Sequence, residues 1–234
     1  MPGKKKTNAV ASRRKRRAGL TAPLERERIV RTALALVDRE GLKALSMRRL
    51  GAELGVDPMA VYYHIPNKHA LLHAIVEAVM AGIDLTADHA SESPEERVLC
   101  AARAYRDAML AHVNALPILL SHGPSTEAAL RPVELLTGIL RDAGLSPAQA
   151  LAGMNAIAAA VRGTAGMYAS GGSEPPAREQ IEAMARRVPM SEFPYLREAM
   201  PHAGELSECG FDFGIRALVR GLLAEAREGE VKAL

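Results

Sequence analysis

Residues 46–68 read SMRRLGAELGVDPMAVYYHIPNK, and this stretch decides the fold. Ser46 is a preferred N-cap residue for a short helix, which ends at Gly55 because glycine readily adopts the left-handed conformation of a helix C-terminus. Asp57 is suited to cap a second helix in the same way. Pro66 restricts the residue before it to extended geometry, so the second helix is only about seven residues long. The stretch therefore predicts two short helices joined by a tight turn.

The apolar and polar positions of this stretch match a helix-turn-helix that binds DNA. The residues that we expect to lock the two helices together are Leu50, Leu54, Val56 and Val61. With these turned inward, the second helix presents outward Met59, Ala60, Tyr62 and Tyr63. A short capped helix fits the major groove end-on, with the positive end of its dipole toward phosphates. Similar helical corners occur in proteins that do not bind DNA, so the pattern alone is only moderately specific.

The charges of the chain are unevenly distributed along its length. Residues 1–20 contain eight Lys and Arg residues and no acidic residue, whereas residues 71–234 contain fourteen basic and twenty-one acidic residues. A polyanion repels an acidic body and attracts a basic end, so this gradient orients the N-terminal end toward nucleic acid. The alternative is that the basic run only aids solubility.

Helical periodicity dominates the rest of the chain, and strand patterns are almost absent. Besides the two short helices, the pattern predicts helices over residues 24–40, 68–84, 94–112, 127–143, 147–169 and 207–228, with a loop after residue 170 that carries one short helix over 178–187. The expected fold is all-α: an N-terminal three-helix helix-turn-helix domain plus a larger helical ligand-binding and dimerisation domain. We expect a basic, disordered arm over residues 1–20, the DNA-binding domain over 21–67, and the ligand-binding and dimerisation domain over 68–234.

The run from Leu24 to Asp84 resembles the N-terminal domain of the TetR (tetracycline repressor) family of regulators. The residues that carry this resemblance are Ala33-Leu34-Ala35-Leu36, Gly41-Leu42, Leu45 to Leu50, Leu54-Gly55-Val56, Val61 to Lys68, and Leu71-Leu72. The end of the chain is similar to the last helix of the tetracycline-repressor branch, through Phe211 to Arg216 and Gly221-Leu222. The resemblance implies a homodimer that represses from a palindromic operator and is released by a small molecule.

The same resemblance implies which residues contact double-stranded operator DNA. Arg48 would reach a base edge, where a guanidinium matches the paired acceptors of guanine. Tyr62 and Lys68 would hold phosphates, and the arm residues Arg13, Arg14, Arg16 and Arg17 would track phosphates or enter the minor groove. Tyr63 and His64 complete the expected set. Pro58, Met59 and Ala60 replace a polar set at the tip of the family's reading helix, so the operator should differ from that of the tetracycline repressor.

Two helices have the composition of a dimer interface. The helix over residues 147–169 carries small residues at helical spacing, and the last helix carries an apolar stripe that is unsuited to water. The expected interface residues are Ala152, Ala156, Ala160, Phe211, Ile215, Leu218 and Leu222. In the family, helices at these positions form a four-helix bundle about a two-fold axis; the alternative is that both helices belong to the core of a monomer. Two reading helices about 34 Å apart would match successive major grooves.

The sensor pocket is expected among the helices over residues 94–169. Its candidate lining is Tyr105, Met109, His112, Leu116, Leu119, His122, Leu136, Met154, Ile157, Arg162 and Met167. Leu119 aligns with a magnesium-binding histidine of the tetracycline repressor, and Asp84 and Ala101 replace two of its drug contacts. Tetracycline with magnesium is therefore not expected, although His122 lies nearby as a partial substitute. A lining rich in methionine and aliphatic residues suits an apolar or aromatic effector.

Other classes of function have little support in the sequence. It contains no nucleophile elbow, no phosphate-binding loop and no dinucleotide-binding fingerprint, so we expect no enzyme and no cofactor. His69 and His73 stand four residues apart, a spacing that can bind zinc, but solvated helix surface is the simpler interpretation and no metal is expected. No apolar run or signal peptide points to a membrane, so we expect a cytoplasmic protein. A DNA-binding regulator without ligand control, and an activator, remain alternatives.

Overall fold

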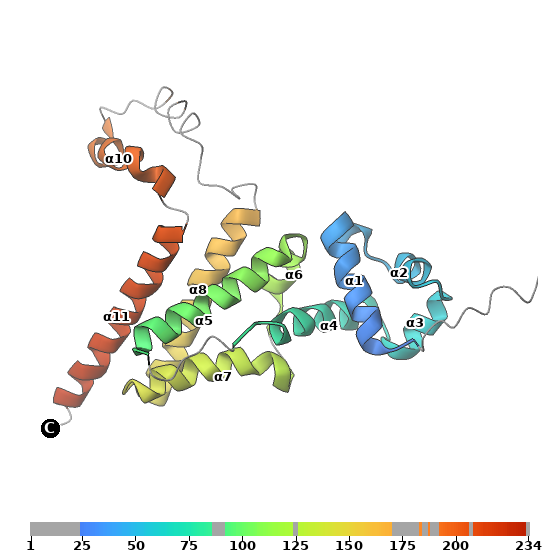
Figure 1. Cartoon of the computed structure of the whole chain (residues 1–234), viewed down its shortest axis with the longest axis horizontal. Helices are drawn as coiled ribbons and strands as arrows, with labels where there is room; N and C mark the ends of the chain where they lie inside the picture. Colours follow the sequence, from blue (N-terminus) through green and yellow to red (C-terminus); the bar gives the residue numbers. More distant parts are fainter. Residues whose placement is uncertain are drawn as a thin grey trace, which may run out of the picture.

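The computed structural model describes residues 24–85, 92–123, 126–169, 183, 187, 192–205 and 208–232. Within these residues every regular element is a helix, which confirms the all-α prediction. Figure 1 shows a small group of helices, α1 to α3, at one end of the molecule and a larger group, α5 to α11, at the other. Helix α4 lies between the two groups and connects them. The predicted arm over residues 1–20 lies outside the described residues, and so does nearly all of the helix predicted over 178–187.

The N-terminal domain consists of α1 (Arg26–Glu40), the short 3₁₀ helix η1 (Leu42–Ala44), α2 (Met47–Leu54) and α3 (Pro58–His64). The capping interactions are those that the sequence predicts. The backbone N–H of Arg49 donates to Ser46 Oγ at 3.1 Å, and that of Met59 donates to Asp57 Oδ1 at 2.8 Å. Gly55 ends α2 in the left-handed conformation, with φ 71° and ψ 27°. Local sequence therefore sets the ends of both short helices.

The connecting helix and the larger domain follow in chain order. The elements are α4 (Lys68–Ala81), α5 (Pro94–Ala111), η2 (Val113–Ala115), α6 (Leu116–Ser121), α7 (Glu127–Asp142), α8 (Pro147–Ala169), α10 (Pro194–Ala199), η4 (Met200–Glu205) and α11 (Glu208–Lys232). Helix α4 ends three residues earlier than predicted, where Gly82 follows its last turn. The short elements η2, α6, α10 and η4 were not predicted, because each is too short to show a helical period.

One apolar core runs through both domains. In the N-terminal domain, Ile29, Leu36 and Leu50 are fully buried, and helix α1 packs against α4. In the larger domain α8 packs against α5 and α7, and α7 also packs against α4. Because α4 contributes Leu71 and Ile75 to this continuous core, a displacement of α4 changes the packing of both domains. No helix within the described residues is long and apolar enough to span a membrane.

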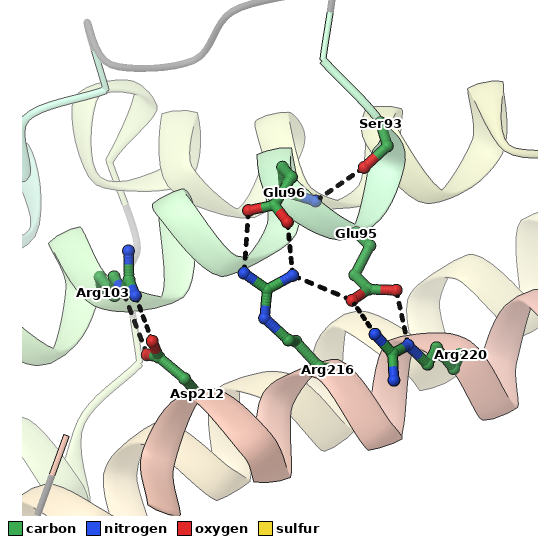
Figure 2. A network of polar contacts seen from close by, with 7 residues as sticks. All are labelled: Ser93, Glu95, Glu96, Arg103, Asp212, Arg216 and Arg220. Atoms are coloured by element: carbon green, nitrogen blue, oxygen red, sulfur yellow. Dashed lines mark hydrogen bonds and ion pairs between the residues drawn. The ribbon is translucent and has the colours of Figure 1, made fainter. Parts of the chain in front are cut away.

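Helix α11 is held on α5 by a row of ion pairs, shown in Figure 2. Arg220 donates to Glu95 through two nitrogens at 2.8 Å, and Arg216 donates to both Glu95 and Glu96. Arg103 pairs with Asp212 one to two turns away. These hydrogen bonds lower the pKa of the three carboxyl groups and raise that of Arg216, because each partner stabilises the charged form of the other.

Candidate DNA-reading surface and effector cavity

Helices α2 and α3 cross at close range at Gly51. A β-carbon built on Gly51 would lie 3.2 Å from the Cα and N atoms of Pro58 and 3.2 Å from the carbonyl oxygen of Val56. All three neighbours are backbone atoms, which cannot move aside as the end of a side chain can. Glycine at this position therefore lets the start of α3 approach α2, and it fixes the angle at which α3 is presented. The sequence analysis predicted the turn but did not single out this contact.

Helix α3 presents most of the predicted reading residues to solvent. Val61 is its one buried residue, whereas Met59 is 61% exposed, Tyr62 41% and Tyr63 87%. His64 is also exposed, and Pro58 and Ala60 are half-buried. Exposed apolar and aromatic side chains at the tip of a short helix are unfavourable in water unless a partner covers them. Helix α3 therefore presents an exposed apolar and aromatic surface on which a partner could bind.

Two adjacent arginines on α2 differ in their surroundings. Arg49 forms ion pairs with Glu40 at 2.8 Å and with Glu53 at 3.3 Å, and the hydrogen bond to Glu40 raises the pKa of Arg49. Arg48 is exposed and makes no hydrogen bond or ion pair with any residue that the structure describes. The guanidinium of Arg48 is therefore available for an external acceptor, whereas that of Arg49 is engaged within the protein.

Lys68, the first residue of α4, connects that helix to the N-terminal domain. Its Nζ donates to the carbonyl oxygen of Leu45 at 2.7 Å, just before α2 begins. An ammonium group has three N–H donors, so this bond leaves two for a phosphate. Asn67 caps the same helix end by accepting from the N–H of Ala70 at 2.8 Å. The arm residues Arg13, Arg14, Arg16 and Arg17 lie outside the described residues.

The larger domain contains an apolar cavity of about 170 Å³ that opens between α4, α5, α7 and α8. It is lined by Met80, Leu85, Ala101, Tyr105, Leu130, Pro132, Val133, Leu136, Met154, Asn155, Ala158 and Arg162. Most of this lining is aliphatic, with a polar end where Arg162 Nε donates to the hydroxyl of Tyr105 at 2.9 Å. Pockets of this composition bind small organic molecules and orient them by a few polar groups.

The cavity contains four of the predicted lining residues, namely Tyr105, Leu136, Met154 and Arg162. Of the other predicted residues, Met109, Leu116, Leu119 and Ile157 are buried but do not line it, and Met167 is 74% exposed. His112 pairs with Asp38 and His122 lies beside α4, as described below. Helical periodicity identifies the buried face of a helix, but it does not show which buried residues border an empty space. Met80 and Leu85 were missed for this reason.

A second connection joins the two domains at η2. His112 Nδ1 lies 2.9 Å from Asp38 Oδ2 near the end of α1, and Asn114 Nδ2 donates to the carbonyl oxygen of Asp38 at 2.7 Å. The other carboxyl oxygen of Asp38 is buried and has no hydrogen-bond partner among the residues that the structure describes. His112, predicted as a cavity residue, therefore belongs to the domain junction instead.

The predicted dimer residues of α8 face solvent, at least in part, whereas those of α11 pack mainly inside the protomer. On α8, Ala152 and Ala160 are exposed and Ala156 is half-buried. On α11, Phe211 and Ile215 are buried within the protomer, where Arg106 lies 4.6 Å from the centre of the Phe211 ring. Leu218 and Leu222 are half-buried, and the δ-carbons of Leu222 approach Gly153 of α8. The apolar residues that the protomer leaves exposed include Leu151 at 52% and Phe213 at 75%.

Comparison with known families covers both domains. Residues 29–75 match the model of bacterial regulatory proteins of the tetR family, and residues 87–226 match that of the tetracyclin repressor-like C-terminal domain. The first match contains α2 and α3, and the second contains nearly the whole cavity. The first match ends within α4, and the second begins at residue 87, after α4 has ended.

Individual relatives agree over nearly their whole length. The chain is 29% identical to the class E tetracycline repressor of Escherichia coli, over 88% of this chain and 94% of the relative. It is 30% identical to the HTH-type transcriptional repressor DrrR1 of Streptomyces coeruleorubidus, over 87% of this chain and 80% of the relative. Among solved structures, the Streptomyces coelicolor TetR family protein ActR in complex with actinorhodin superposes with a TM-score of 0.76 at 30% identity, covering 89% of this chain and 99% of ActR. The chain belongs to the TetR family of bacterial transcription regulators.

Proposed function

We propose that this regulator represses transcription as a homodimer that binds a palindromic operator and is released when an apolar or aromatic molecule enters the cavity beside α4. The observation that carries the proposal is that α4 takes part in both sites. Its first residue, Lys68, donates a hydrogen bond to Leu45 in the N-terminal domain, which we call the reading domain. Met80, in the last turn of α4, lines the cavity. Twelve residues of helix separate them, or about 18 Å. A ligand that displaces Met80 therefore acts on one end of a rigid element whose other end positions α2 and α3.

The reading surface supports an operator contact that combines base reading with apolar contacts. Arg48, which has no partner among the described residues, offers its guanidinium to a guanine edge, and exposed Met59 and half-buried Ala60 suit thymine methyl groups. Tyr62 on α3 and Lys68 at the start of α4 would contact phosphates, and we expect Tyr63, His64 and the basic arm to add further contacts. Contacts to phosphates make binding depend on salt, whereas the base contacts make it depend on sequence.

The polar end of the cavity narrows the class of effector. Arg162 is half-buried and cationic, and its bond to Tyr105 uses Nε, which leaves the two terminal nitrogens for a ligand oxygen. The remaining wall is apolar apart from Asn155. We therefore propose an effector with a flat apolar body and one acidic group, such as a carboxylate or an ionised phenol. The complex of ActR with actinorhodin supports a small-molecule effector for this chain.

The function is tested in two steps. An operator is first selected from random duplexes with the purified full-length protein, and candidate effectors are then tested for their ability to release the protein from that operator. We expect a palindromic sequence, and binding that weakens steeply as the salt concentration rises. Polycyclic aromatic carboxylic acids are then compared with their uncharged amides for release of the operator. The acids should release it at lower concentration, and the variant Arg162→Met should remove this difference. Equal release by acid and amide in the unmodified protein would contradict the proposed role of Arg162.

Ligand control and repression are checked separately. A protein that binds the operator but is released by no compound, although calorimetry shows that a compound is bound, would be a regulator without ligand control. A promoter fused to the selected operator should be less active when the protein is present, whereas an activator would raise its activity.

A further inference from the structure

Three histidines that are distant in the sequence meet at the start of α4. His69 and His73 lie on the first two turns of α4, and His122 directly follows α6. The ring nitrogens available as ligands, one from each residue, all lie within 4.8 Å of one another. His73 and His122 are half-buried, and His69 is exposed. The sequence showed only the pair on α4, because His122 is brought to it by tertiary packing of α6 against α4.

The arrangement of the rings is close to that needed by a metal ion. The ring centres are 4.5 Å apart for His69 and His73, 4.6 Å for His73 and His122, and 5.9 Å for His69 and His122. Zinc binds imidazole nitrogen at about 2.0–2.1 Å, so three nitrogens on a tetrahedral ion are separated by roughly 3.4 Å. The separation in this structure exceeds that value by no more than about 1.4 Å. We expect rotation of the three side chains to close this difference.

The surroundings of His122 prepare it to act as a ligand. Its Nδ1 lies 3.1 Å from the carbonyl oxygen of Ile118 and 2.9 Å from Ser121 Oγ. The Ser121 hydroxyl itself donates to the carbonyl oxygen of Pro117 at 2.8 Å. The proton of the His122 ring is therefore best placed on Nδ1, which donates to Ile118, and the lone pair is left on Nε2. Metal-binding histidines characteristically have their second nitrogen held in this way.

We propose that His69, His73 and His122 bind a divalent late first-row metal ion, with Zn²⁺ as the physiological candidate. Three imidazole nitrogens without a thiolate or a carboxylate favour Zn²⁺, Cu²⁺, Ni²⁺ or Co²⁺ over Mg²⁺ and Ca²⁺. The exposed side of the cluster, at His69, leaves a fourth position for water. The site is separate from the effector cavity, because His73 precedes Met80 by seven residues along α4, about 10 Å.

A metal ion at this position would fix the start of α4 to the end of α6. The ligands on α4 begin one residue after Lys68, whose Nζ is bonded to Leu45 in the reading domain. The bound ion therefore restrains the part of α4 nearest to α2 and α3, and it opposes any displacement of α4 relative to α6. The binding of the metal does not depend on the proposed function, but its effect on DNA binding does.

The metal site is tested with full-length protein that carries no histidine tag and has been stripped with a chelator. Co²⁺ is titrated first, because its visible absorption reports nitrogen coordination, and Zn²⁺ is then used to displace it. We expect one ion per protomer and a higher melting temperature with Zn²⁺. His69→Ala, at an exposed position, should keep the fold and weaken Zn²⁺ binding at least tenfold, as should His73→Ala and His122→Ala. His202→Ala removes a histidine outside the cluster and should bind Zn²⁺ as the unmodified protein does.

The results separate this proposal from the proposed function. Absence of stoichiometric binding, or equal binding by the unmodified protein and His69→Ala, would overturn the metal site, whatever the protein does with DNA. Operator affinity is then measured with and without Zn²⁺, and we expect it to change in the unmodified protein but not in His69→Ala. Metal bound without any change in operator affinity would overturn the restraint on α4. If the unmodified protein bound no operator, either with or without Zn²⁺, the result would instead contradict the proposed function.

Discussion

Arg48 and Arg49 show how one residue can be reserved for a partner while its neighbour supports the fold. Both are exposed on α2, yet the carboxylates of Glu40 and Glu53 surround only Arg49. A base edge must compete with these carboxylates for Arg49, whereas for Arg48 it competes with no partner among the described residues. The two residues therefore share chemical type and helix, and both are exposed, but they differ in their partners among the described residues.

Arg48→Ala is expected to weaken operator binding by about 1–3 kcal/mol and to relax the preference at one base position. The measurement is a titration against the selected operator and a set of duplexes that each change one base pair. Arg49→Ala serves as the control and should retain the sequence preference. Uniform weakening of Arg48→Ala on every duplex, including unrelated ones, would instead identify Arg48 as a phosphate contact.

Because Gly51 has no side chain, it allows the close contact that sets the angle between α2 and α3. In Gly51→Ala, the new methyl group meets the backbone of Pro58 and Val56, and overpacking of this kind costs about 1–3 kcal/mol. Alanine regains about 1 kcal/mol of helix propensity, so we expect a net loss of up to about 2 kcal/mol in the free energy of unfolding, together with weaker operator binding. Gly138→Ala on α7 is the control, since no atom lies within 4 Å of its new methyl group, and it should be neutral or stabilising. An equal gain in both variants would refute the close contact.

At the scale of helices, the caps of α2, α3 and α4 could be predicted from sequence because each depends on residues within four positions of one another. The cavity wall and the histidine cluster could not. Met80 lines the cavity because of where α5, α7 and α8 pack, and His122 reaches His73 across 49 positions of chain. Periodicity shows that a residue faces the interior, but only the packing shows whether another side chain or an empty space lies opposite it.

The ion pairs between α5 and α11 predict an acid-sensitive contact. Hydrogen bonds from Arg220 and Arg216 lower the pKa of Glu95 in the folded protein. A lowered folded pKa means that the contribution to stability is complete above the usual value of about 4.3, and is lost as the pH falls through the lowered value. We therefore expect the melting temperature to fall between about pH 5 and pH 3, and to fall less in Glu95→Gln. Glu134→Gln, on the exposed face of α7, is the control and should melt with the pH dependence of the unmodified protein.

At the scale of the whole molecule, the candidate reading surface, the cavity and the expected dimer face lie at separate places among the packed helices. Figure 1 shows the reading helices at one end and α11 at the other, with α4, α5 and α7 between them. The junction of His112 with Asp38 is a second mechanical link beside α4. With two connections between the domains, we expect a displacement of α4 to rotate the N-terminal domain about the other connection. In a dimer whose far ends are held together, we expect such a rotation to change the separation of the two α3 helices.

We expect the exposed faces of α8 and α11 to hold two protomers together in the dimer. Phe213 is 75% exposed on α11, beside the exposed positions Gly214 and Ala217, and Leu151 is 52% exposed on α8. Phe213→Lys places a charge on this surface and should convert the dimer to a monomer in sedimentation velocity. Because a second half-site contact raises affinity by about 10²–10⁴ through effective concentration, operator binding should fall by at least 100-fold while weak, salt-dependent binding to any duplex remains. Ala78→Lys, which adds the same charge to the exposed side of α4, should remain dimeric. A Phe213→Lys protein that stays dimeric and keeps its operator affinity would place the interface elsewhere.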